Sequence, residues 1–377
     1  MNELPILTEA DVGTRTVRAF VHREVGVPGR VEKIRLRRVG PHDVRVKIEA
    51  VGICHSDLSL ANGTLAQKFP AVLGHEASGV VSEVGSDIHD LAVGDKVILL
   101  WNPACGECWF CEHESASLCT HAADYQLKPH ALDAGGEVVW AGVGVGAFAE
   151  ETVIPASSAR RFDGIEFNQA AMIGCASVTG VGAAINTGKV AEGQYVAVVV
   201  LGGVGLSAVQ GALLSGAAKV FSIDRSADRL AIAERLGGIP IEAGDDIARR
   251  IRKLADGRGV DVAIDCVGAA ATIRQSWEMT RRGGTAVVVG VGGKDQSVSF
   301  TPLELFYFAR NLVGCVGGAG TPDVDYPRLV EWARTGKLVT DGLITSTFGL
   351  DGIEDAFRLM REASGGRAII YPTRTAE

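Results

Sequence analysis

The sequence predicts an α/β protein that combines a barrel-like β domain with a doubly wound parallel sheet. From residue 15 to about 155, short runs of alternating apolar and polar residues, such as ASGVVSEVG at 77–85, are broken by Gly, Pro and Asp. This pattern is typical of antiparallel strands. After Ile185, apolar strands such as QYVAVVVL at 194–201 alternate with amphipathic helices, which indicates βαβ units and a parallel sheet. The 377 residues are enough for two domains.

The individual elements follow the same two sequence patterns. In the first region, further candidate strands are VRVKIEAVGIC at 44–54 and GDKVILLW at 94–101. In the second region, the strand at 194–201 is followed by strands predicted at 219–224, 260–268, 285–293 and 311–318. The tail departs from this repeat, with helices predicted near 326–336 and 351–363 and a final strand, RAIIYP. Sequence alone leaves open whether this tail folds back onto the first domain.

Composition argues against several classes of partner. The net charge is −8 and the pI is about 5.6, so no broad basic surface is expected for nucleic acid or anionic lipid. The longest purely apolar runs, such as VAVVVL at 196–201, are far shorter than the roughly 20 residues of a membrane-spanning helix. The first residues carry acids and lack a basic segment before an apolar stretch. We therefore expect a cytoplasmic protein with no nucleic-acid or membrane partner.

Four cysteines are gathered in the stretch PACGECWFCEHESASLC. Cys105, Cys108, Cys111 and Cys119 have the spacing C-x2-C-x2-C-x7-C. Four thiolates complete the tetrahedral shell of zinc and leave no position for substrate, so this lobe, at about 103–120, is predicted to hold a structural zinc. Disulfides are disfavoured because a cytosolic chain keeps its thiols reduced, and the nearby histidines are expected to be solvated bystanders.

The first βα turn, V-L-G-G-V-G at 200–205, predicts a dinucleotide site. Glycines here let a pyrophosphate approach the helix N-terminus, and the candidates are Gly202, Gly203, Val204 and Gly205. Asp224 ends the next strand, 19 residues beyond Gly205, where an acid binds a ribose diol and favours NAD over NADP; its alternative role is a helix N-cap. Val200 replaces the first glycine of the motif, and valine disfavours positive φ. We expect a slightly remodelled turn, and NAD binding at least as tight after Val200→Gly.

A second metal site is suggested by Cys54 in CHSD, His75 in LGHE and Cys175 in MIGCAS. Two cysteines and one histidine would leave a zinc coordination position open to substrate. From spacing alone, the alternative of isolated structural residues remains open. Cys266 and Cys315 lie in apolar strands and are interpreted as core residues.

These motifs together resemble one family. GICHSD, LGHEASGVVSEVG, GDKVIL, the four-cysteine lobe, IGCASVTG and LGGVGLSA occur in the order and spacing of the zinc-dependent medium-chain alcohol dehydrogenases, over about residues 30–370. The resemblance implies a GroES-like catalytic domain from residues 1–176 and 320–377, and a Rossmann NAD-binding domain at 177–319. It also implies two zinc ions per chain, one in the lobe and one held by Cys54, His75 and Cys175, with Asp57 orienting the histidine.

The resemblance implies roles for further residues. Ser56 would accept the alcohol proton while a hydride passes to the nicotinamide, and Glu76 would approach the metal or pair with an arginine. Expected cofactor contacts are His55 and Arg367 at the pyrophosphate, Arg229 at the adenosine ribose, Thr179 and Val204 at the nicotinamide side, and also Val267 and Val291. The expected substrate pocket is Leu65, Trp101 and Val291.

An apolar primary or aromatic alcohol, or its aldehyde, is the expected substrate, and a homodimer or homotetramer the expected assembly. INTG at 186–189 and GVGAFAE at 144–150 resemble the branch that oxidises a mycothiol–formaldehyde adduct, which remains the alternative. A glutathione adduct is disfavoured because ANGTLAQKFP lacks acids. A non-catalytic nucleotide-binding protein of the same fold is disfavoured by the intact zinc ligands together with Ser56.

Overall fold

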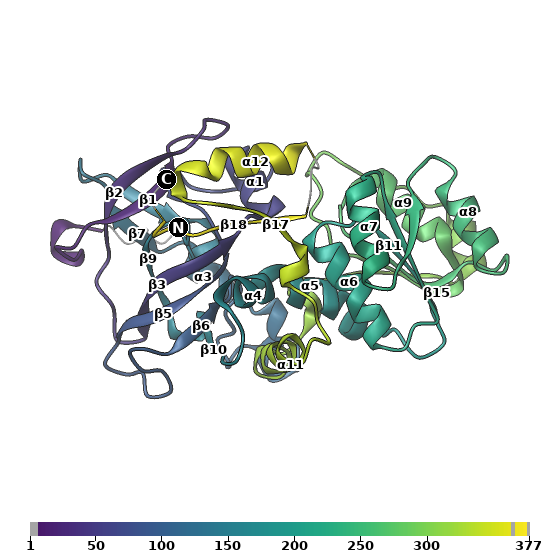
Figure 1. The fold of residues 1–377 in the computed structure, drawn as a ribbon, viewed down its shortest axis with the longest axis horizontal. Helices are drawn as coiled ribbons and strands as arrows, with labels where there is room; N and C mark the ends of the chain where they lie inside the picture. Colours follow the sequence, from purple (N-terminus) through teal and green to yellow (C-terminus); the bar gives the residue numbers. More distant parts are fainter. Residues whose placement is uncertain (1–6, 363–365, 375–377) are drawn as a thin grey trace.

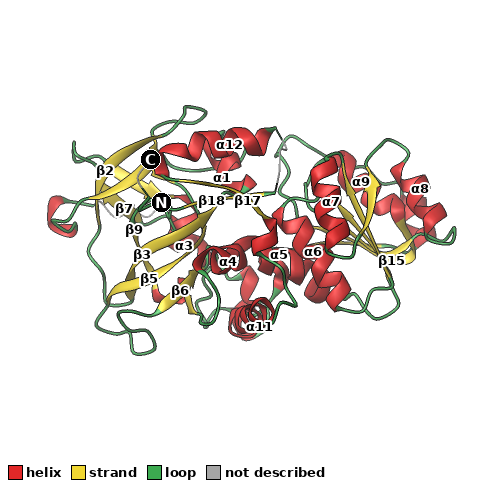
Figure 2. Ribbon diagram, in the orientation of Figure 1, coloured by secondary structure: helices red, strands yellow, loops and turns green. Residues whose placement is uncertain are grey.

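The computed structural model describes residues 7–362 and 366–374 and arranges them in two lobes (Figure 1). One lobe holds the β-rich N-terminal region and the last strands of the chain, and the other holds the parallel sheet. Figure 2 shows that strands dominate the first lobe, whereas helices flank the strands of the second on both sides. The predicted α/β fold with two architectures is therefore confirmed.

The first lobe contains a closed barrel and an open sheet that share no strand. The barrel strands, in spatial order, are β1 (Val17–His22), β2 (Arg30–Leu36), β7 (Pro129–Leu132), β8 (Val138–Ala141) and β4 (Ala71–Val72). The open sheet has the order β10 (Ala159–Arg161), β6 (Lys96–Leu99), β5 (Glu76–Val84), β3 (Asp43–Gly52), β18 (Arg367–Ile370) and β17 (Ile344–Phe348), and β9 (Glu151–Pro155) also pairs with β3. The helices that accompany these sheets are α1 (His55–Ala61), α2 (Trp109–Glu112), α3 (Ala122–Gln126), α11 (Pro322–Arg334) and α12 (Ile353–Arg361).

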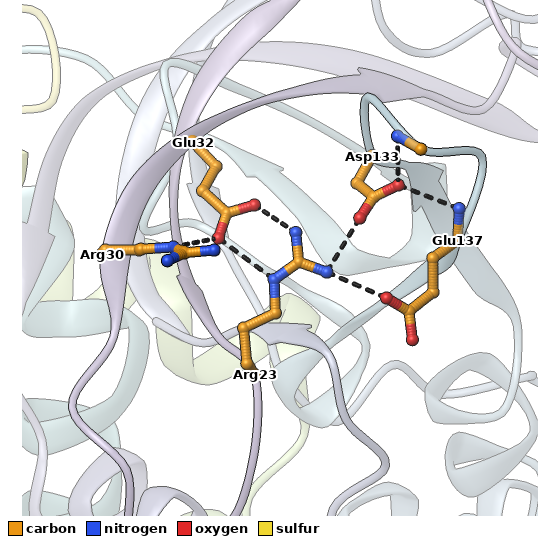
Figure 3. Close-up of polar contacts among 6 residues, drawn as sticks. Arg23, Arg30, Glu32, Asp133 and Glu137 are labelled. Atoms are coloured by element: carbon orange, nitrogen blue, oxygen red, sulfur yellow. Dashed lines mark hydrogen bonds and ion pairs between the residues drawn. The ribbon is translucent and has the colours of Figure 1, made fainter.

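A charged cluster ties the barrel strands together (Figure 3). Arg23, just after β1, binds Glu32 on β2 through two nitrogen atoms, and lies 2.8 Å from Asp133 and 2.9 Å from Glu137 in the β7–β8 turn. Hydrogen bonds from Arg23 lower the pKa of Glu32. Burial alone would raise the pKa of Asp133, but the guanidinium and two backbone N–H groups lower it. The cluster therefore joins four neighbouring strands in a charge-dependent way.

The second lobe is built on a six-stranded parallel sheet. Its spatial order is β13 (Ile239–Glu242), β12 (Lys219–Asp224), β11 (Tyr195–Val199), β14 (Val260–Asp265), β15 (Thr280–Val288) and β16 (Asn311–Gly314). The connecting helices are α6 (Gly203–Leu214), α7 (Ala227–Arg235), α8 (Ile247–Leu254), α9 (Ala270–Met279) and α10 (Pro302–Phe308). The sequence pattern missed β13, which is short and contains Pro240. Proline is tolerated there because β13 is an edge strand.

The tail of the chain returns to the first lobe. β18 pairs antiparallel with β3, with Ile369 opposite Gly52 and Ile370 opposite Val51. The backbone N–H of Ile53 also donates to the carbonyl oxygen of Ala368 at 3.0 Å. The fold-back that the sequence left open is therefore observed, while the domain limits at 177 and 319 stay predictions.

One long helix connects the lobes. Residues Phe167–Thr187 run through α4 (Phe167–Met172), a π-helical turn (Ile173–Ser177), α5 (Val178–Gly182) and a second π-helical turn (Ala183–Thr187). By length and hydropathy this helix resembles a membrane span, but 78% of its most apolar window is buried inside the protein, as in a core helix. α4 packs on β3 and β5, and α5 packs on α6. A Cβ at Gly180 would lie 2.1 Å from the carbonyl oxygen of Val204, so this close packing requires glycine.

Candidate active site and metal centres

Three buried side chains meet where the first lobe faces the second. Cys54 is the N-cap of α1, His75 directly precedes β5, and Cys175 lies in the first π-helical turn. Their ligand atoms all lie within 4.8 Å of one another, and His75 Nε2 is 3.4 Å from Cys175 Sγ. Irregular π-helical turns often mark functional positions in helices. Here the turn carries Cys175, which lies next to His75, the residue before β5. The structure thus gathers the three predicted zinc ligands.

Asp57 holds this group in place, as the resemblance implied. It is 0% exposed, and its Oδ1 lies 2.9 Å from His75 Nδ1 and accepts the Gly74 N–H at 3.0 Å. Its other oxygen accepts the Cys54 N–H at 3.3 Å. Burial alone would lower the pKa of His75, but Asp57 and Cys54 raise it. Because Asp57 occupies Nδ1, the histidine presents Nε2 to the two sulfur atoms.

The donor set fits a divalent soft cation. A hydrogen bond between the two thiols holds the pKa of Cys54 well below its ordinary value and raises that of Cys175. The two buried sulfur atoms and the imidazole nitrogen lie close enough together to bind one ion, and a metal binds cysteines as thiolates. Two sulfurs and one imidazole nitrogen suit zinc and leave its fourth position free.

The four-cysteine lobe forms a second, closed ligand set. The sulfur atoms of Cys105, Cys108, Cys111 and Cys119 also lie within 4.8 Å of one another, and two backbone N–H groups donate to sulfur, from Cys105 to Cys119 at 3.4 Å and from Cys108 to Cys105 at 3.3 Å. The histidines nearby are engaged elsewhere. His113 stacks on Trp109 at 4.3 Å, and His121 contacts Asp124 at 3.0 Å. This arrangement is consistent with a structural metal whose coordination shell is complete.

Glu76, beside the ligand His75, forms a buried ion pair with Arg367 of β18. Arg367 binds both carboxylate oxygens, and the exposed side-chain fractions are 0% for Glu76 and 8% for Arg367. Burial raises the pKa of Glu76 to about 7, with the guanidinium acting in the opposite direction. A Cβ at Gly203 would lie 3.1 Å from the Arg367 Cζ. The buried Arg367 side chain therefore lies between the Glu76 carboxylate, beside the candidate metal site, and Gly203, the first residue of α6.

The glycine-rich turn adopts a conformation that we expected valine to avoid. Val200 has φ +68°, a left-handed conformation that costs about 1–2 kcal/mol for L-residues, so the expectation of a remodelled turn is wrong at this residue. A Cβ at Gly205 would lie 2.0 Å from the Val200 carbonyl oxygen, whereas one at Gly202 would meet no atom within 4 Å. The third glycine permits close packing, and the second borders open space.

Asp224 lies beside this turn and is buried. Its Oδ2 accepts the Leu201 N–H at 2.6 Å and lies 3.9 Å from Arg229 Nη1, and its Oδ1 accepts the Ser226 N–H at 2.9 Å. Ser226 is the N-cap of α7, so the alternative role of Asp224 as that cap is wrong. The carboxylate instead fixes the strand end against the glycine-rich turn.

The remaining predicted cofactor residues lie in several different elements. His55 is exposed and Ser56 half-buried at the start of α1, Thr179 is buried in α5, and Val204 is half-buried in α6. Val267 lies close to the segment that carries Val291, because a Cβ at the preceding residue, Gly290, would be 2.0 Å from the Val267 carbonyl carbon.

The three predicted substrate-pocket residues lie in different surroundings. Leu65 and Trp101 pack against the apolar core of the first lobe, and Trp101 lines a cavity of about 30 Å³ together with Val178 and Gly317. Val291 is 57% exposed. That the three residues line one substrate pocket therefore stays a prediction.

Sequence reasoning missed one positioning residue. Tyr326 of α11 is buried, and its hydroxyl donates to the carbonyl oxygen of Gly174 at 3.3 Å. Gly174 precedes Cys175 in the π-helical turn, so Tyr326 braces the metal-ligand segment. No local motif marks this tyrosine, and the only signal available was its place on a helix of the returning tail.

The chain has close counterparts among known proteins. The family models described as "Alcohol dehydrogenase GroES-like domain" and "Zinc-binding dehydrogenase" match residues 40–163 and 203–335. Alcohol dehydrogenase class-3 of Drosophila melanogaster is 34% identical over 370 residues, which cover 94% of this chain and 97% of that protein. Benzyl alcohol dehydrogenase from Acinetobacter calcoaceticus has a TM-score of 0.88 at 26% identity, covering 95% of this chain and 99% of the other. A Sinorhizobium meliloti 1021 protein bound to NADP has a TM-score of 0.78 at 25% identity, covering 95% and 100%.

These similarities agree with the geometry. The GroES-like model covers Cys54, His75 and the four-cysteine lobe, the other model begins at Gly203 of the dinucleotide turn, and the Drosophila relative spans nearly the whole chain. The two cysteine-containing ligand sets are those expected from the motifs. The chain is an oxidoreductase, and it belongs to the zinc-dependent medium-chain alcohol dehydrogenase family.

Proposed function

We propose that this enzyme transfers a hydride between an apolar primary or aromatic alcohol and NAD, producing the aldehyde, with the reverse reaction equally accessible to the site. The observation that carries the proposal is the open, three-ligand group of Cys54, His75 and Cys175, connected through Arg367 to the N-terminus of α6. The benzyl alcohol dehydrogenase with the same fold supports an aromatic substrate. Leu65 and Trp101 supply apolar surface on the first lobe.

Each residue has a defined task in this proposal. Zinc, held by the three ligands, would supply Lewis-acid polarisation of the alcohol oxygen. Asp57 fixes the histidine tautomer, and the half-buried Ser56 hydroxyl accepts and passes on the alcohol proton. Arg367 remains charged within the buried pair and offers positive charge to the pyrophosphate.

NAD is proposed over NADP because of Asp224. Its carboxylate is buried and already accepts the Leu201 N–H, so it offers a fixed acceptor for a ribose hydroxyl and repels a 2′-phosphate. The NADP-bound relative shows that a protein of this fold can hold the phosphorylated cofactor, so the choice must be tested directly. Asp224→Ala should weaken NAD binding and narrow the difference from NADP. A wild-type enzyme that prefers NADP tenfold would contradict this proposal.

The substrate proposal is tested with a panel of alcohols and aldehydes, followed by nicotinamide absorbance. Benzyl alcohol and medium-length primary alcohols should be turned over faster than sugars or glycerol. The same panel should include formaldehyde with mycothiol, the alternative substrate. If only the thiol adduct supports turnover, that alternative replaces the apolar alcohol.

We also propose a homodimer that pairs two β16 edges. β16 is the open edge of the parallel sheet, and neighbouring α10 exposes Leu303, Phe306 and Tyr307, with Phe306 84% exposed. Pairing two copies about a two-fold axis would cover both the free backbone groups and this apolar face. Light scattering after gel filtration should give twice the chain mass, and Phe306→Asp should shift it toward the monomer. We propose three further properties. The protein is cytoplasmic, it binds two zinc ions per chain, and its nucleotide-binding domain spans residues 177–319.

A further inference from the structure

Val200 is held in its left-handed conformation by contacts on either side. Its own N–H donates to the Ile223 carbonyl oxygen at 2.8 Å, and the next N–H, of Leu201, donates to Asp224 Oδ2 at 2.6 Å. Both partners belong to the end of β12. A β-branched residue with positive φ is a genuine outlier, and such strain persists where the surroundings over-determine it, often at functional positions. The direction of the valine side chain is therefore set by the neighbouring strand.

Val200 belongs to a small group of half-buried apolar residues at the carboxyl end of the sheet. Half-buried Val200, Ile241 and Ala243 pack against the same core cluster. The Ala243 N–H donates to the Asp224 carbonyl oxygen at 2.9 Å, which draws the end of β13 toward β12. Three adjacent strand ends thus bring these apolar residues close to one buried carboxylate, that of Asp224.

We propose that Val200 forms part of the apolar floor under the purine base of the dinucleotide and thereby determines its affinity. A flat heterocycle attached to a ribose needs apolar contact for the ring and, beside it, an acceptor for the ribose hydroxyls. Val200 would provide the apolar contact and Asp224 the acceptor. The inference rests on the proposed use of NAD. It replaces the expectation from the sequence motif, in which glycine at residue 200 would bind NAD at least as well.

A purely structural role for the valine predicts different behaviour. If Val200 only fills the core, shortening it lowers stability without affecting the adenosine half of the cofactor. If it contacts the base, shortening it weakens every ligand that carries adenine and no ligand that lacks it. AMP and nicotinamide mononucleotide separate these cases, because each carries one half of NAD.

The experiment uses the zinc-loaded full chain and its Val200→Ala and Val200→Gly variants, with Val93→Ala as a matched control on an exposed residue of the other lobe. Calorimetric titration should show AMP and NAD binding weakened about tenfold in Val200→Ala, since each buried methyl group contributes roughly a factor of four. Nicotinamide mononucleotide should bind all four proteins equally. Val200→Gly should lose AMP affinity even if it melts at a higher temperature.

The outcomes are distinct. AMP binding within twofold of wild type in both Val200 variants overturns the inference, and so does an equal loss of both half-ligands, which would indicate a collapsed turn. If wild type binds neither AMP nor NAD, the proposed cofactor and the inference about Val200 both fail.

Discussion

Removing one partner of the buried Glu76–Arg367 pair should destabilise the protein strongly. The two side chains are 0% and 8% exposed, so Glu76→Gln leaves a guanidinium in a site that water barely reaches. Breaking a buried pair in this way costs about 3–5 kcal/mol. For a chain of this size, we expect the melting temperature to fall by roughly 4–6 °C.

Removing both charges should be much less harmful than the single changes suggest. Arg367→Gln leaves the carboxylate alone, whereas the double variant has no uncompensated charge. A double-mutant cycle should therefore show coupling of at least about 1–2 kcal/mol. NAD titration separates the roles: Glu76→Gln keeps the guanidinium and should bind NAD nearly as wild type, whereas Arg367→Gln should bind it more weakly.

The assay combines thermal unfolding, NAD titration and zinc analysis for wild type, both single variants and the double variant. Zinc content is the control, because Glu76 is adjacent to the ligand His75. If the loss of unfolding free energy in the double variant equals the sum of the two single losses to within about 0.5 kcal/mol, the reasoning is refuted.

Three further predictions follow from other parts of the structure. Cys54→Ser should lower zinc from two ions to one per chain and abolish turnover with little change in melting temperature, whereas Cys108→Ser should lower that temperature markedly; metal analysis and calorimetry test both. Ser56→Ala should reduce alcohol oxidation about 100-fold without weakening NAD binding, and near-full activity would move the proton route elsewhere. Arg23→Gln should lower the free energy of unfolding at pH 7. On acidification the variant should lose less of this free energy than wild type, because the carboxyl groups that Arg23 binds in wild type have lowered folded-state pKa values. Their contribution is present above the unfolded values of about 4 and disappears as pH falls through the folded ones, so urea unfolding curves from pH 7 to 2.5 should converge.

Residues whose role depends on short-range pattern could be predicted, and residues whose role depends on distant contacts could not. Cys54, His75 and Cys175 were found because their motifs occur at strand-to-loop junctions and in a family order. Tyr326 was missed because its partner, Gly174, is 152 residues away. β13 was missed because an edge strand needs little apolar periodicity.

Val200 was misjudged for a related reason. Backbone preference alone disfavours positive φ at a valine. The contacts to the end of β12 impose that conformation, and they become apparent only once the sheet order is known. A local rule was overridden by a tertiary contact.

The long helix from Phe167 to Thr187 has a consequence for dissecting the protein. The predicted domain limit at residue 177 falls at the end of its first π-helical turn, two residues after Cys175. A fragment ending there would keep the ligand but cut the helix before α5, the segment that packs on α6. The helix half left behind would expose apolar surface that the other lobe now covers, and the ligand would sit at a fraying end. The two halves of this enzyme should therefore be poor independent folding units, and the metal centre a property of the undivided chain.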